Sequence, residues 1–326
     1  MLKKLKFFFL INTAVTLSVI LALSVYCRYV QKTSINAFIA SVYLDVTDFN
    51  GIYESTEKCY HAINDMRESN LRDIELPAMD CKVENHHTGK TQYLTMGFEN
   101  ESDTLIFYFP GGGFIDQPKT QHWSFLNKLI SQTKIPVIVP IYLKVTSYCA
   151  KDAYEDILSL YTQYTADPTV RKVILMGDSS GGNMALSLAL QLRETEEKQP
   201  EKLILISPWM DLSMDNPEME NYKESEFMVG LAGLKILGNK WARTENIYDP
   251  FISPLYASFI NLGEIVIFSG AEDMLHPDIM RFKERLEKDK APHSIYVEEN
   301  LPHVYPLFPT PEAAKAFELI KYEVLY

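Results

Sequence analysis

A serine flanked by glycines is the first feature of this sequence that could do chemistry. The segment GDSSG at 177–181 has the form Gly-x-Ser-x-Gly, and it lies between an apolar run at 172–176 and a helical pattern at 182–193. In a nucleophile elbow the serine sits on a strained turn between a strand and a helix, and small neighbours are required there. The pattern therefore predicts Ser179 as a nucleophile, with the amide of Ser180 directed at a developing oxyanion. A Ser/Gly turn without chemistry is the alternative.

Three consecutive glycines form a second candidate element. Gly111, Gly112 and Gly113 follow Pro110 and the apolar run TLIFYF at 104–109. Glycine tolerates unusual backbone angles and close approach, so such a loop can present amides to an oxyanion. A flexible turn is the alternative. A phosphate cradle is excluded because the loop has no Gly-x-Gly-x-x-Gly.

A general base is expected among the three histidines that follow Ser179. His303 lies in the loop between the last expected strand, 294–298, and the last expected helix, 311–324. In folds with a nucleophile elbow the chain order is serine, acid, histidine, which favours this loop. His276 enters a helix and His293 opens a strand, where a histidine is usually a packing or surface residue. His303 is therefore the predicted base, with a plain surface histidine as the alternative.

The elements that must position these residues alternate regularly. Strands are expected at 104–109, 135–139, 172–176, 202–206, 264–269 and 294–298, and helices at 121–131, 150–165, 182–193, 277–288 and 311–324. This alternation predicts an α/β protein with a mostly parallel central sheet and helices on both faces. An antiparallel hairpin is expected from 81–84 and 92–98, with its turn at 87–90.

Two segments interrupt the alternation. Residues 29–78 include apolar positions at helical spacing from Ile35 to Val46, which predicts a short amphipathic helix. Residues 211–248 are rich in charge and methionine. Both segments are expected to lie over one end of the sheet as a helical cap, where Phe227, Met228 and Trp241 are apolar candidates for a pocket.

The motifs in combination resemble the hormone-sensitive-lipase-like branch of the α/β-hydrolases. Besides PGGG at 110–113 and GDSSGG at 177–182, SPWMDL at 207–212 and DPFISPL at 249–255 are similar to segments of that branch. The resemblance covers about residues 80–326 and implies the α/β-hydrolase fold. Pro110 stands where the branch has a histidine, so the loop lacks one of the family's contacts.

The resemblance also implies roles for particular residues. Gly112, Gly113 and Ser180 would supply the oxyanion-hole amides. GAEDML at 270–275 is similar to the family's Asp-x-Leu segment, which selects Asp273 as the acid, with Glu272 as the fallback. Asp278 matches a further acidic position that is more often structural. Asp178 is expected to orient the backbone rather than to titrate.

These residues together predict a serine hydrolase of carboxylic esters, and the resemblance implies a carboxylesterase or deacetylase that acts on short-chain acyl esters. Ser179, His303 and Asp273 would form the triad, and the reaction would pass through an acyl-enzyme. No metal and no organic cofactor is expected. The expected substrate is a small lipophilic ester. A serine peptidase and a catalytically silent protein that binds a small molecule are the alternatives.

The N-terminus has the pattern of a membrane anchor. Lys3, Lys4 and Lys6 precede the run 7–27, which has no charged residue and is about long enough to cross a bilayer. The positive-inside rule then places the chain after Arg28 on the extracytoplasmic or lumenal side. The expected organisation is an anchor or cleaved signal peptide at 1–28, cap helices at 29–78 and a hydrolase domain at 79–326. With an anchor the layout resembles arylacetamide and steryl deacetylases, and with a cleaved signal peptide the protein would be secreted.

Composition narrows the class further. The 326 residues are 47% hydrophobic and 23% charged, with a formal net charge of −12. The apolar content excludes a disordered chain, and the negative charge argues against a nucleic-acid partner. The four cysteines, Cys27, Cys59, Cys81 and Cys149, form no Cys-x-x-Cys, which argues against structural zinc. Cys59 and Cys81 could pair, or all four could be free thiols. The sequence leaves the oligomeric state unknown.

Overall fold

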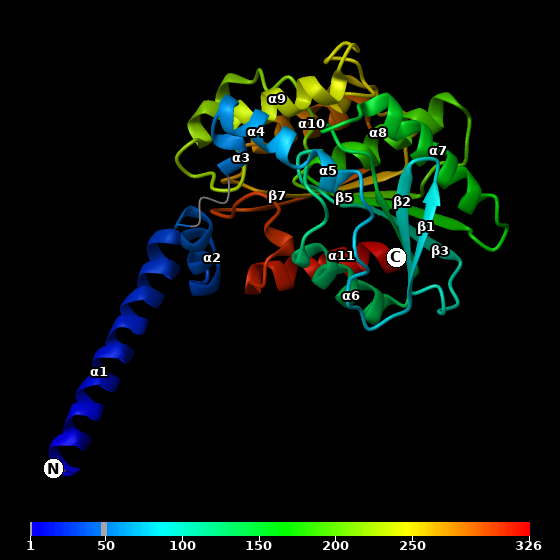
Figure 1. Cartoon of the computed structure of the whole chain (residues 1–326). Helices are drawn as coiled ribbons and strands as arrows, with labels where there is room; N and C mark the ends of the chain where they lie inside the picture. Colours follow the sequence, from blue (N-terminus) through cyan, green and yellow to red (C-terminus); the bar gives the residue numbers. More distant parts are fainter. Residues whose placement is uncertain (1, 47–50) are drawn as a thin grey trace.

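A single sheet lies at the centre of this computed structural model, which describes residues 2–46 and 51–326 (Figure 1). In the described chain the sheet has eight strands in the order β1-β2-β4-β3-β5-β6-β7-β8. The strands are β1 Val83–Thr88, β2 Thr91–Met96, β3 Thr104–Phe109, β4 Val137–Ile141, β5 Lys172–Asp178, β6 Lys202–Ile206, β7 Glu264–Gly270 and β8 His293–Glu298. The first two are antiparallel to their neighbours and the remaining six run parallel. The predicted mostly parallel sheet is confirmed.

The register of the parallel strands brings their carboxyl ends to one edge. Phe109 at the end of β3 pairs with Gly177 of β5, and Asp178 pairs with Ile206 at the end of β6. Gly270 at the end of β7 pairs with Glu298 at the end of β8. The loops that follow β3, β5, β7 and β8 therefore leave the sheet side by side, as expected for a ligand site in this class of fold.

Helices cover both faces of the sheet, as predicted. Figure 1 shows α6 and α11 together on one face and α7, α8 and α10 on the other. Their bounds are α6 Thr120–Thr133, α7 Ala150–Thr165, α8 Ser180–Glu194, α10 His276–Asp289 and α11 Pro311–Leu325. The inner strands are buried along nearly their whole length because helices shield them from water on both sides.

The two interrupting segments meet each other. The first contains α2 Ile35–Val46, α3 Gly51–Glu54, α4 Thr56–Asp65 and α5 Arg67–Asn70, and the second contains the 3₁₀ turn η2 Pro217–Tyr222 and α9 Leu231–Ala242. Helices α3 and α4 pack against α9 (Figure 1). The approach is close at Gly233, where a Cβ atom would lie 2.4 Å from the Cα of Tyr53. Residues 47–50 of the predicted cap segment lie outside the described residues.

Two predicted boundaries are wrong by a few residues. The hairpin turn is Gly89-Lys90 rather than 87–90, because β1 and β2 stay paired up to Thr88 and Thr91 and Gly89 supplies the positive φ of +54°. Strand β4 begins two residues later than expected and runs to Ile141, because its pairing with β2 continues to that residue. The remaining short 3₁₀ turns are η3 Pro254–Tyr256 and η4 Tyr305–Leu307.

The N-terminal helix extends away from the rest of the molecule. Helix α1 Leu2–Tyr26 is followed by a π-helical turn, η1 Cys27–Gln31 (Figure 1). Within the described part of the chain, no helix combines the length and apolar character that crossing a membrane requires. The anchor predicted at 1–28, with its membrane contact through 7–27, is therefore unsupported.

All four cysteines are free, so the Cys59–Cys81 pair is not formed.

Candidate active site

Ser179 occupies a strained turn at the junction of β5 and α8. Its backbone angles are φ 52° and ψ −121°, a conformation that residues with a side chain seldom adopt. The Ser179 amide donates to the Ile206 carbonyl at 2.9 Å, and the Ser179 carbonyl accepts from the Trp209 amide at 3.0 Å. Helix α8 begins at the next residue, Ser180. The predicted strand–nucleophile–helix geometry is thus present.

The glycines of the motif are required by contact distances. A Cβ atom on Gly177 would lie 2.4 Å from the Gly181 carbonyl oxygen, and one on Gly181 would lie 1.9 Å from the Phe109 carbonyl oxygen. Both distances are far below van der Waals contact. The spacing Gly-x-Ser-x-Gly therefore follows from how tightly α8 starts against β5 and β3.

His303 and Asp273 form a buried pair. The His303 Nδ1 lies 2.9 Å from Asp273 Oδ2, and the two residues are 2% and 0% exposed. Asp273 Oδ1 accepts from the Leu275 amide at 2.8 Å, which fixes the carboxylate. With Nδ1 donating to Asp273, Nε2 is the ring nitrogen that remains to accept a proton.

Electrostatics raise the pKa of His303. Burial alone lowers the pKa of the imidazole, but the Asp273 carboxylate and its hydrogen bond raise it, and Glu226 and Asp178 add to that effect. The net direction is a pKa above the usual value for histidine. Such a shift suits a base that must hold a proton during the reaction.

Ser179 and His303 share one cavity. It measures about 50 Å³ and is also lined by the three glycines of the loop, by Met228 and Val229, and by Tyr53. No hydrogen bond joins Ser179 to His303 in the described structure. Such bonds are often long before a substrate binds and shorten in the reacting complex.

In the described structure, the glycine loop lines this cavity and contains two unpaired amides. Gly112 has φ +128° and Gly113 has φ +59°, so both adopt conformations that favour glycine. Among the described residues, neither amide donates to another group, while the Gly112 carbonyl accepts from Ile115 and Asp116. Two unpaired amides in residues that line the cavity, with the helix start at Ser180, are the parts that an oxyanion hole needs.

Side chains from β3, β5, α6 and the residue after β4 hold this loop in place, and of these only Asp178 was expected from the sequence. Asp178 Oδ1 accepts from the Gly111 amide at 3.0 Å and from the Tyr108 hydroxyl at 2.7 Å, and Asp178 Oδ2 accepts from His122 Nε2 at 3.2 Å. The Tyr142 hydroxyl donates to the Pro110 carbonyl at 2.6 Å. Asp178 therefore orients backbone, as expected, and Tyr142 contacts the residue that departs from the family pattern.

The remaining candidates lie outside the catalytic cavity. His276 contacts Ser269 and His293 contacts the Ala291 carbonyl, so neither histidine approaches Ser179. Glu272 differs from Asp273 in that its carboxyl makes no contact with His303. Trp241 packs underneath the loop, with its ring 4.1 Å from the ring of Phe114. Of the three apolar cap candidates, only Met228 lines the cavity.

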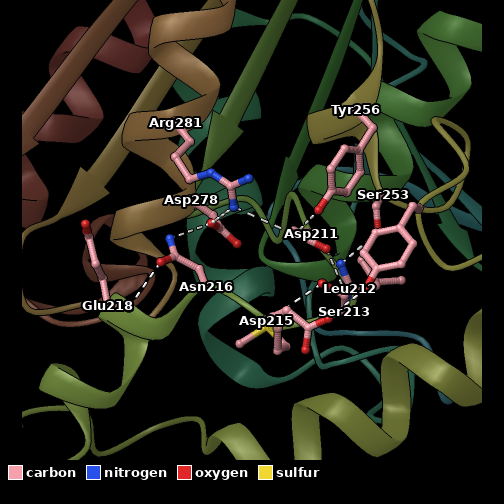
Figure 2. Close-up of polar contacts among 12 residues, drawn as sticks. Asp211, Leu212, Ser213, Asp215, Asn216, Glu218, Ser253, Tyr256, Asp278 and Arg281 are labelled. Atoms are coloured by element: carbon pink, nitrogen blue, oxygen red, sulfur yellow. Dashed lines mark hydrogen bonds and ion pairs between the residues drawn. The ribbon is translucent and has the colours of Figure 1, made fainter.

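Acidic residues near the cap form a separate structural cluster. Figure 2 shows Asp211, Asp278 and Arg281 grouped between α10 and the start of the 211–248 segment. Arg281 Nη1 lies 2.8 Å from Asp278 Oδ1 and 3.8 Å from Asp211 Oδ2. Asn216 donates to Asp278 at 2.8 Å, and Tyr256 donates to Asp211 at 2.7 Å. The structural role expected of Asp278 fits these contacts, which fix the cap segment to α10.

A buried carboxylate beside the His303–Asp273 pair was also not foreseen. Glu226 is 2% exposed and comes from the charged sequence KESEF at 223–227. Such a sequence is typical of a solvated surface, so it carries no signal of burial.

Among the described residues, no group of three or more His, Cys, Asp or Glu side chains is arranged to hold a metal ion.

Comparison with known proteins identifies relatives of the same architecture. A family model described as the α/β-hydrolase fold matches residues 106–307. An esterase of Acinetobacter venetianus is 29% identical over 187 residues, which cover 56% of this chain and 61% of that protein. Steryl acetyl hydrolase 1 of Saccharomyces cerevisiae is 31% identical over 205 residues, 55% of this chain and 47% of the relative. The chain therefore spans about half to three fifths of the length of these two relatives.

A solved structure agrees over a larger share of the chain. A Staphylococcus aureus protein assigned as an esterase superposes with a TM-score of 0.80 at 25% sequence identity. The superposition covers 85% of this chain and 95% of that one. The superposition therefore extends beyond the residues that the family model matches.

Proposed function

Because this chain belongs to the α/β-hydrolase family, we propose that it is a serine carboxylesterase that removes short acyl groups from lipophilic esters. One observation carries the proposal. The strained Ser179, the buried His303–Asp273 pair and the free amides of Gly112 and Gly113 all meet at one cavity. The relatives named esterase and acetyl hydrolase support the same reaction class.

The proposed reaction uses each of these groups. His303 Nε2 accepts the proton of the Ser179 hydroxyl while Oγ attacks the ester carbonyl carbon. The amides of Gly112, Gly113 and Ser180 stabilise the oxyanion of the tetrahedral intermediate. The C–O bond to the alcohol then breaks, and His303 returns the proton to the leaving oxygen. Water hydrolyses the acyl-enzyme by the same sequence, with Asp273 holding the imidazole throughout.

The size of the catalytic cavity favours a short acyl group. Its volume of about 50 Å³ is a few times the roughly 10–15 Å³ that a cavity needs to hold one water molecule. Tyr53 and the Met228–Val229 segment close it from the cap side. An acetyl-sized group fits such a space, whereas a long acyl chain would require these residues to move.

A larger apolar groove adjoins the cavity and supports the lipophilic part of the substrate. The groove measures about 970 Å³ and lies between α2, α6 and α11, and it shares Gln121 and Leu307 with the catalytic cavity. On its α2 wall, Ile39 and Tyr43 are 54% and 63% exposed. Ile39 and Tyr43 of the apolar face predicted for 35–46 thus border this groove, whereas Ala37 and Leu44 of the same helix pack into the core. We assign it to the alcohol part of the ester.

The alternatives have less support. A peptide substrate would need an open cleft for an extended chain, whereas the cap closes over Ser179. A silent receptor would not need the Asp273 hydrogen bond that fixes the tautomer of His303. No observation favours either one.

The first test is an ester panel. We expect kcat/KM for p-nitrophenyl esters to be highest for acetyl and butyryl groups and to fall toward palmitoyl, because the cavity at Ser179 is small. Ser179→Ala should abolish turnover, and Ser187→Ala, a buried serine farther along α8, should leave it unchanged. A maximum at palmitoyl would overturn the short-acyl claim, and absence of turnover for every ester would favour the silent receptor.

A further inference from the structure

Glu226 joins the cap to the loop of the catalytic acid. Its Oε1 accepts from the Met228 amide at 2.7 Å, and its Oε2 accepts from the Met274 amide at 3.2 Å. Met228 lines the catalytic cavity, and Met274 directly follows Asp273. The two oxygens of this buried carboxylate therefore connect Met228, which lines the cavity at Ser179, with Met274 in the loop that carries Asp273. A third, longer contact runs to the Val229 amide at 3.4 Å.

The same carboxylate lies in the electrostatic field of the triad. Burial, followed by the nearby Asp273 charge, raises the pKa of Glu226 to about 7, while His303 and the backbone amides act in the opposite direction. In return, Glu226 is one of the groups that raise the pKa of His303. The titratable groups around it are thus Asp273 on the β7–α10 loop, His303 on the β8–α11 loop and Tyr222 on its own segment, whose carbonyl accepts the Glu226 amide.

We propose that Glu226 is a positioning residue that fixes the 226–229 segment over Ser179 and supplies a second negative charge to the Asp273–His303 pair. The proposal rests on the serine esterase function and deepens it. With Glu226 ionised, both oxygens accept amides and the positive charge on the imidazolium is stabilised. An uncharged side chain at this position removes that charge. A glutamine also loses one acceptor, because its NH₂ group cannot accept from an amide.

The test is the titration of His303 in the full chain. We expect Glu226→Gln to lower the pKa of His303 by roughly half a unit or more, because a neighbouring negative charge favours the charged imidazole. The shift is measured by NMR of the imidazole without any substrate, so it does not depend on esterase activity. In the active enzyme the acid limb of kcat/KM should move to lower pH by the same amount, since only neutral His303 can accept the serine proton.

A second variant separates the charge from the contacts. Glu226→Asp keeps the charge on a shorter side chain, so we expect the His303 titration to stay near that of the wild type while kcat/KM at neutral pH falls about fivefold or more. The matched control is Glu323→Gln, a buried glutamate that pairs with Lys202 at the opposite end of the sheet. It should leave the His303 titration unchanged.

The outcomes are distinguishable from failure of the proposed function. An unchanged His303 titration in Glu226→Gln, or an equal shift in Glu323→Gln, would overturn the role of Glu226 even in a fully active esterase. A wild-type protein without esterase activity that still shows the predicted shift would instead overturn the function and leave the coupling in place.

Discussion

The reactivity proposed for the site rests on what surrounds three ordinary side chains. Ser179 sits in a conformation that its neighbours impose, and His303 is buried against a carboxylate that fixes one ring nitrogen. A serine hydroxyl and an imidazole in water would neither line one cavity nor have the shifted imidazole pKa. The chemistry at this scale is therefore a property of burial and geometry.

Asp273→Asn tests the acid. We expect kcat to fall by about three to four orders of magnitude with KM little changed, because asparagine no longer holds the tautomer in which Nε2 accepts the serine proton. The pKa of His303 should also fall, because the charge that raises it is lost. The measurement is a pH profile of kcat/KM, in which the residual activity extends to lower pH.

Asp278→Asn is the matched control for that change. Asp278 is a buried carboxylate only five residues later, but it contacts Arg281 and Asn216 rather than His303. We expect its variant to keep kcat within a few-fold of the wild type. If Asp273→Asn retained activity within tenfold, Glu226 would replace Asp273 as the candidate acid.

Individual site residues could be predicted from the sequence where the proposed chemistry needs a fixed spacing of residue types. Ser179 could be predicted because the elbow demands glycines on either side, and His303 because the chain order places it after the last strand. Asp273 needed the family resemblance to separate it from Glu272. Glu226 and His122 left no signal, because their burial arises from contacts with segments distant in sequence.

The loop after β3 depends on contacts from neighbouring elements. Pro110 has no amide hydrogen and stands where the related branch has a histidine, yet its carbonyl accepts from Tyr142 after β4. The Phe114 amide donates to Ser180 Oγ at the start of α8 at 3.3 Å, and Gly111 is held by Asp178. Three elements thus fix the backbone that presents the Gly112 and Gly113 amides.

Tyr142→Phe tests this account of the loop. We expect kcat to fall about fivefold with KM nearly constant, because a net hydrogen bond of about 1 kcal/mol that keeps the loop in place is lost. Steady-state kinetics with p-nitrophenyl acetate provide the measurement. Tyr154→Phe is the control, since its hydroxyl lies 3.4 Å from Asn183 and does not contact the loop. Equal losses in both variants would contradict the role of Tyr142.

Whether a segment forms a helix or a strand was easier to predict than what packs against it. The alternation of apolar runs and helical patterns predicted every parallel strand, because all of them except the edge strand β8 are buried along most of their length. The 35–46 helix was also predicted, but not that its apolar side borders a groove. Its spacing specifies an apolar face without specifying what covers that face.

The whole molecule brings together loops that are far apart in the chain. The carboxyl edge of the sheet gathers the glycine loop, the elbow, the acid loop and the base loop, and the cap segments close over them (Figure 1). The order of strands made this edge predictable. How the cap segments pack together could not be predicted, because their packing depends on close contacts such as that of Gly233 with Tyr53. The location outside the cytoplasm stays a prediction.

The central claim is that Ser179 is the nucleophile of a working triad. The most direct measurement is the intact mass and peptide map of the protein after reaction with a fluorophosphonate, with Ser179→Ala and Ser187→Ala treated in parallel. We expect one phosphonyl adduct, located on Ser179 in the wild type and in Ser187→Ala, and none in Ser179→Ala. An adduct that persists at full level in Ser179→Ala, or that maps to another residue in the wild type, would contradict the account.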